Sequence, residues 1–135
     1  MTSDFDLSLE PYIRAALGKK AIGLAALDVR NLTSIADAFI ICNGRSNRQV
    51  TAIGEHIKQH LKEQGIKPLS VEGMKEGRWV LLDYGHIIIH IFYEPVRGFY
   101  DLDGLWIDAR KIKTDFYSES LHNTKSPKAE SLNEQ

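Results

Sequence analysis

The turn Gly44-Arg45-Ser46 has the residue types that a phosphate-binding site uses. It follows an unbroken apolar run at residues 38–42 and precedes a helix that Ser46 can cap. Free backbone N–H groups and the helix dipole would therefore face an anion there. The spacing matches neither a P-loop nor a dinucleotide-binding fingerprint, and no pair of metal-binding carboxylates follows it. A helix capped after a tight turn is the favoured interpretation, and a nucleotide-binding enzyme is the alternative.

Other residues are candidates for a nucleophile or a metal ligand, but none has the partner residues that a complete site needs. Cys42 has His56, His60 and His90 as possible general bases, but it ends an apolar run, where a buried and inert thiol is the usual finding. His56 and His60 lie four residues apart on a predicted helix, a spacing that can hold a metal, yet no third ligand follows at a matching distance. We therefore predict no catalytic residue, no metal site and no cofactor.

The elements that position these residues centre on a predicted β-hairpin. Two apolar runs, residues 78–83 and 87–92, flank Gly85, which suits the first position of a two-residue type II′ turn. Because side chains alternate along a strand, one face of the hairpin is almost wholly apolar and should lie in the core. The other face carries Trp79, Leu81, Asp83, Ile88, His90 and Phe92.

This second face has two interpretations that the pattern does not distinguish. A helix from either end of the chain could cover it, as in many mixed folds. It could instead be a docking surface with Trp79 as its anchor, since Trp, Tyr and Arg dominate binding hot spots. Asp83 and His90 lie diagonally on this face and, with Glu94, would form its polar rim, either as a hydrogen-bonded pair that orients the surface or as an acid–base pair.

The remaining segments predict an α/β (α+β) fold with a single mixed sheet flanked by helices. Ser46 and Gln49 form a capping box at the start of the clearest helix, and a crossover helix of this kind joins parallel strands. The predicted elements are a helix that Ser8 caps and that runs to about Lys19, strands at 22–29, 38–42 and 69–72, a helix at 46–65, the hairpin, and a helical spacing of apolar residues at 99–106.

Length and composition predict one soluble domain. We assign residues 1–117 to that domain and predict a disordered polar tail at 118–135. The net charge of −1 gives no global field toward nucleic acid or membrane, so we expect no sequence-specific nucleic-acid binding. A single cysteine, an acidic N-terminus and the lack of a long apolar run predict a cytoplasmic protein with no membrane partner.

Six segments share their order and spacing with a known family. They are DAFIIC at 37–42, GRSNRQV at 44–50, EG at 72–73, GRWVLLDYG at 77–85, HIF at 90–92 and FYDLDGLW at 99–106. Together they resemble the Iojap-like ribosomal silencing factor family, over about Ile22 to Trp106.

The resemblance implies a non-enzymatic factor with a nucleotidyltransferase-like fold. Members of that family bind the large ribosomal subunit through its protein fourteen and block association with the small subunit, which represses translation when nutrients are scarce. Trp79 corresponds to the family's exposed aromatic position, and the hairpin geometry extends the expected partner-binding set to Met74, Leu81, Asp83 and His90. We also consider a homodimer of the free protein, in which two such faces pair with each other and hide the docking surface.

Overall fold

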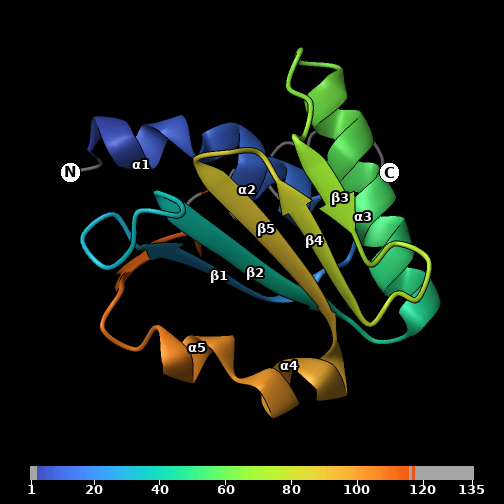
Figure 1. Ribbon diagram of the computed structural model, residues 1–135. Coiled ribbons are helices and arrows are strands. Elements are labelled where there is room, and N and C mark those ends of the chain that lie inside the picture. The colour runs from blue at the N-terminus through green and yellow to red at the C-terminus, as the bar shows by residue number, and fades with distance from the viewer. Residues whose placement is uncertain (1–2, 116, 118–135) are drawn as a thin grey trace, which may run out of the picture.

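The computed structural model describes residues 3–115 and 117, and it shows a six-stranded mixed sheet with helices on both faces (Figure 1). The predicted fold class, a single mixed sheet flanked by helices, is confirmed. The predicted tail at 118–135 lies outside the described residues. The elements are α1 (Asp4–Ser8), α2 (Glu10–Leu17), β1 (Ile22–Asp28), β2 (Ala38–Gly44), α3 (Asn47–Lys62), β3 (Ser70–Glu72), β4 (Trp79–Asp83), β5 (Ile87–Tyr93), α4 (Glu94–Tyr100), α5 (Leu102–Leu105) and β6 (Arg110–Ile112).

The strands lie in the order β3-β4-β5-β2-β1-β6. β2 pairs with β5 in parallel, and the other pairs are antiparallel. β3 consequently runs parallel to β2, as the crossover through α3 predicted, although β5 and β4 lie between them. Every residue of β2 is buried, as expected for a strand covered on both faces.

The β4–β5 hairpin has the predicted register. Trp79 pairs with Phe92, and Leu81 pairs with His90. The backbone N–H of Tyr84 donates to the carbonyl of Ile87 at 2.9 Å, and Gly85 between them has φ 92°, a conformation that favours glycine.

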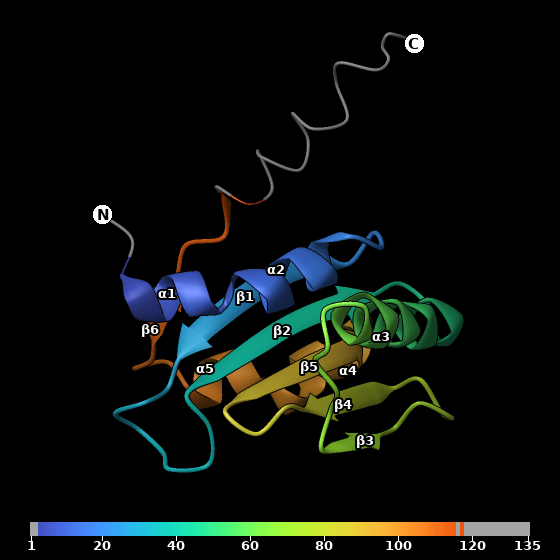
Figure 2. The same ribbon diagram turned by 90° about the horizontal axis from the view of Figure 1, so that it is seen from above.

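Two hydrophobic clusters lie on opposite faces of the sheet. The apolar face of the hairpin packs under α2 and α3, whose buried residues include Ile13 and Ile57, both fully buried. The second hairpin face packs with the opposite cluster, where α4 contributes Val96 and α5 contributes Leu102. In Figure 2, which looks down on the molecule, α2 and α3 lie in front of the sheet, and α4 and α5 lie behind it. Helices from the C-terminal half therefore cover part of the face that carries Trp79.

Three local predictions were wrong or incomplete. The helix predicted to start at Ser8 corresponds to α2, which starts at Glu10 and has no side-chain cap, because Ser8 is the last residue of a separate α1 that Ser3 caps. The helical spacing after Pro95 forms two short helices, and β6 follows them without a sequence signal. In the α3 cap, Ser46 Oγ accepts from Gln49 N at 3.0 Å, but the Gln49 side chain reaches back to Arg45 N at 2.6 Å.

Candidate functional site

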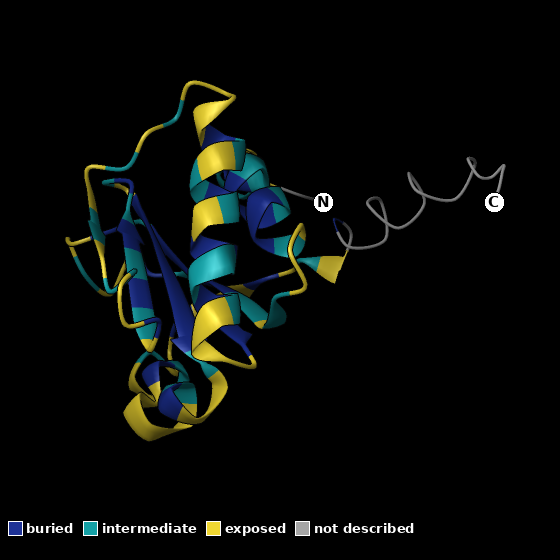
Figure 3. Ribbon diagram, turned by 90° about the vertical axis from the view of Figure 1, so that its right-hand side faces the viewer, coloured by how far each residue is buried: buried dark blue, intermediate teal, exposed yellow. Residues whose placement is uncertain are grey.

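Large apolar side chains are exposed along α4, α5 and the residues after them. Phe99 is 82% exposed, Leu105 70%, Ile107 67% and Tyr100 50%. Figure 3 shows the outer side of these two helices as mostly exposed. We call these four residues the α4–α5 surface. Grouped exposure of large apolar side chains marks interaction sites, whereas single exposed ones are common on any protein.

Arg97 holds α4 against the sheet and against α5. Its Nε and Nη2 donate to the two carboxylate oxygens of Asp103 at 3.1 and 2.8 Å. Its Nη1 donates to Oδ1 of Asn43 at 3.1 Å and to the backbone carbonyl of Gly23. The bonds from Arg97 hold the pKa of Asp103 below its usual value. One guanidinium therefore joins α4, α5, β1 and β2.

Asp101 separates the two helices. It has φ 50°, a left-handed conformation that Asp tolerates better than most residues, and it ends α4. Its Oδ1 then accepts from Gly104 N at 3.1 Å and so caps α5. After this break, Leu102 at the start of α5 is buried and Leu105 at its end is exposed.

Trp79 links the hairpin to the α4–α5 surface. It is half-buried at the start of β4. Its ring lies 4.9 Å from that of Phe92 on β5 and 4.8 Å from that of Tyr100 on α4. Aromatic pairs at such separations add packing energy beyond their buried area. Trp79 therefore forms one surface with the exposed residues of α4 and α5.

His90 lies under Trp79 and is only 6% exposed. Its Nδ1 accepts a hydrogen bond from Trp79 Nε1 at 3.1 Å. Burial lowers the pKa of His90 to about 4, so the ring is neutral at neutral pH. The hydrogen-bonded Asp83–His90 pair that we considered is not found, because Asp83 Oδ1 instead accepts from Gly85 N at 2.8 Å and stabilises the turn.

No hydrogen bond joins Cys42 to His56, His60 or His90 in the described part of the chain. Cys42 is fully buried, and burial raises the pKa of its thiol to about 12. The rings of His56 and His60 lie 5.9 Å apart, and among residues 3–115 and 117 no group of three or more His, Cys, Asp or Glu side chains could hold a metal ion. The helix start at Ser46 is occupied by its own cap.

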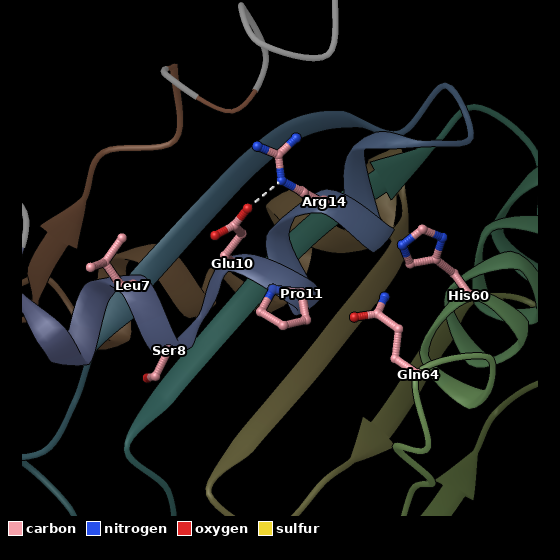
Figure 4. A pocket seen from close by; sticks show the side chains of 7 residues that line it. All are labelled: Leu7, Ser8, Glu10, Pro11, Arg14, His60 and Gln64. Atoms are coloured by element: carbon pink, nitrogen blue, oxygen red, sulfur yellow. Dashed lines mark hydrogen bonds and ion pairs between the residues drawn. The ribbon is translucent and has the colours of Figure 1, made fainter. Parts of the chain in front are cut away.

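A shallow pocket of about 300 Å³ lies between α1–α2 and the end of α3 (Figure 4). Glu10 and Arg14, two of its charged side chains, form an ion pair with each other at 2.7 Å. The charges in this pocket are therefore partly neutralised, and the pocket lies on the side of the sheet opposite the α4–α5 surface. No helix in the described part of the chain is both long and apolar enough to cross a membrane.

Comparison with known proteins assigns the family. A family model described as "Ribosomal silencing factor during starvation" matches residues 2–135. The chain belongs to the ribosomal silencing factor family. It is 42% identical over 98 residues to the ribosomal silencing factor of Bacillus subtilis, covering 73% of this chain and 83% of that relative. It is 38% identical over 107 residues to the one from Halalkalibacterium halodurans, covering 79% and 92%. A crystal structure of a Bacillus halodurans protein matches with a TM-score of 0.70 at 34% identity, over 79% of this chain and 97% of that one.

The structure of this ribosomal silencing factor brings together only part of the predicted binding set. Trp79 and Leu81 pack against one cluster, and the buried His90 lies beside it, paired with Leu81 in the sheet and hydrogen-bonded to Trp79. Met74 lies in the opposite cluster, where its sulfur fills the space in front of Gly54 of α3. Asp83 lies at the far end of β4. The partner-binding role stays a prediction for all five residues, Trp79, Met74, Leu81, Asp83 and His90.

Sequence reasoning missed the most exposed part of the surface. The helical spacing of Phe99, Leu102, Leu105 and Trp106 predicts one helix with a buried apolar face, but of these four only Leu102 is buried. The signal that could have revealed the exposure is Asp101-Leu102-Asp103-Gly104, a run with two cap-forming acids and a glycine. Such a run is typical of a break between helices.

Proposed function

We propose that this chain binds the large ribosomal subunit through its protein fourteen and blocks association with the small subunit, repressing translation under nutrient limitation. Membership of the ribosomal silencing factor family supports this function. The observation that carries it is the α4–α5 surface, which continues into Trp79 on the hairpin.

The energetics of such a contact favour this surface over the rest of the molecule. Phe99 and Leu105 are largely exposed, so a partner that covers them removes apolar area from water without first unfolding anything. Trp79 and Tyr100 supply rigid aromatic area, which loses little conformational entropy on binding. Charged residues Glu94 and Asp103 lie beside the apolar centre, as in interfaces that have a polar rim.

Blocking by bulk requires no chemistry from the protein. A folded domain seated on the joining face of one subunit excludes the other subunit as long as it stays bound, and its effect scales with its affinity. We accordingly propose a non-enzymatic factor acting in the cytoplasm, where subunits join.

The test is co-sedimentation of the protein with isolated large subunits, using variants that truncate exposed side chains. Leu105→Ala removes a side chain that is 70% exposed, so the fold should tolerate it. We expect it to weaken binding about fivefold or more, and Trp79→Ala to weaken binding about thirtyfold. Leu69→Ala is the matched control, because Leu69 is 76% exposed but lies next to Asp83, at the end of β4 remote from Trp79.

Subunit joining is then measured by adding small subunits and separating the particles on a sucrose gradient. The wild-type protein and Leu69→Ala should reduce the joined fraction, and Leu105→Ala should restore it. Equal binding by all three proteins would show that another face docks. Failure of the wild-type protein to bind isolated large subunits would contradict the proposed function itself.

The same surface offers a route to self-association in the free protein. Two copies that pair their α4–α5 surfaces would shield Phe99 and Leu105 from water. Sedimentation equilibrium should then show a mass that falls on dilution, and Leu105→Ala should shift the protein toward monomer. A constant monomer mass at high concentration would rule this pairing out.

A further inference from the structure

The hydrogen bond between Trp79 and His90 is the polar contact beneath the docking surface. We propose that His90 is a positioning residue, which fixes the indole of Trp79 in the orientation that docks. This inference rests on the proposed function, since it assumes that Trp79 is the anchor.

Ring packing alone does not fix the indole. Phe92 and Tyr100 contact the Trp79 ring at 4.9 and 4.8 Å, and such contacts restrain the plane of the ring. Such contacts depend mainly on the plane and position of the ring. An indole flipped by a half turn would keep the same plane and therefore much of this packing. A hydrogen bond is directional, and only one of the two orientations puts Nε1 at 3.1 Å from His90 Nδ1.

His90 is itself held firmly enough to act as a reference. It is a central residue of β5, paired with Leu81 of β4 on one side and with Ile41 of β2 on the other. The ring of Phe39 meets the imidazole edge-on at 5.2 Å. An acceptor on a central strand moves less than one on a loop, so it can fix a half-buried neighbour.

A purely structural role explains the histidine poorly. With Nδ1 accepting, the neutral ring carries its proton on Nε2, which is buried and has no hydrogen-bond partner among the described residues. A buried unpartnered donor destabilises the fold. An apolar residue in this cluster of Phe39, Phe92 and Ile41 would avoid that loss. Only Trp79 benefits from an imidazole here, and the low pKa of His90 keeps the ring neutral and accepting at neutral pH.

The experiment compares two kinds of variant that separate stability from positioning. His90→Phe fills the space with an apolar ring but removes the acceptor, and His90→Leu does the same with a smaller side chain should the larger ring not fit. His90→Asn leaves a small cavity but keeps an oxygen acceptor close to the position of Nδ1. The full-length protein is labelled with ¹⁵N, and hydrogen exchange of the Trp79 indole is followed beside urea denaturation and large-subunit binding. The indole signal is assigned with Trp79→Phe.

We expect stability and docking to change in opposite directions. His90→Phe or His90→Leu should unfold at the wild-type urea concentration or higher, exchange the indole proton faster, and bind large subunits roughly three- to tenfold more weakly. His90→Asn should be less stable, yet keep slower indole exchange and tighter binding than the apolar variants. The backbone amides of α3, on the opposite face of the sheet, provide an internal control, because their exchange should follow global stability alone.

Two results would overturn the inference. The first is indole exchange of Trp79 that does not respond to His90→Phe or His90→Leu. The second is binding that follows stability across all the variants, as a structural role requires. If the wild-type protein does not bind large subunits, the proposed function fails, and the indole exchange alone decides whether His90 positions Trp79.

Discussion

Replacing Arg97 should release the α4–α5 surface from the sheet. Arg97→Ala removes the bonds to Asp103, Asn43 and Gly23 at once, whereas Arg97→Lys keeps the charge but reaches fewer of these acceptors. We expect both variants to fold, because the β2–β5 core does not depend on this side chain, and we expect α4 and α5 to separate from the sheet more often.

The magnitude follows from the burial of the partners. The side chains of Arg97 and Asp103 are 15% and 39% exposed, so their two-bond ion pair contributes about 1–2 kcal/mol, between the values for exposed and buried pairs. Asn43 is 7% exposed, and an acceptor left unpartnered there costs about 1–2 kcal/mol. Arg97→Ala should therefore lose about 2–4 kcal/mol of unfolding free energy, and Arg97→Lys about half of that.

Urea denaturation measures the loss, and amide hydrogen exchange locates it. Exchange should accelerate in α4 and α5 before it accelerates in β2 and β5, because local opening needs less free energy than global unfolding. Arg48→Ala is the control, since Arg48 is exposed on α3 and should change stability by no more than about 0.5 kcal/mol. If Arg97→Ala behaves like Arg48→Ala in denaturation and exchange, Arg97 does not hold these helices and our account of the surface is wrong.

Three further outcomes test other parts of the structure. Burial lowers the pKa of His90 from 6.5 to about 4, so as the pH falls the unfolded chain binds a proton at this residue before the folded protein does. Unfolding free energy should therefore fall by roughly 3 kcal/mol as pH drops from 6.5 to 4, and His90→Phe should remove that part of the fall. Gly73→Ala should cost roughly 3 kcal/mol or more in urea denaturation, because a Cβ at φ 83° would lie 2.0 Å from the carbonyl oxygen of Trp79. Gly65→Ala, at φ 80° with nothing within 4 Å, should cost only about 1 kcal/mol. Cys42, fully buried with its pKa raised to about 12, should react with a thiol reagent only at the rate of unfolding; rapid labelling of the native protein would contradict its burial.

The elements that the sequence predicted well depend on local patterns. The hairpin register follows from alternating side chains on either side of Gly85, and a slip by one residue would expose the whole apolar face. α3 follows from its Ser46 cap and from apolar residues at helical spacing, which the structure buries completely. The unbroken apolar run of β2 predicted a strand covered on both faces, and the six-stranded sheet places it between β1 and β5.

The sequence by itself thus determined five of the six strands, the main helix, the two-faced hairpin and, through its ordered motifs, the family. Only the tertiary structure decided which side chains form the surface. The hydrogen-bond partner of His90 is Trp79, eleven residues away, and not Asp83. Arg97 binds the carbonyl of Gly23, 74 residues away. Such partners are chosen by how strands and helices pack in space, which local periodicity does not encode. The left-handed Asp101 shows the same limit, because the helical spacing of Phe99, Leu102, Leu105 and Trp106 predicts one helix. The chain instead breaks at Asp101 into α4 and α5, and Phe99 and Leu105 are exposed.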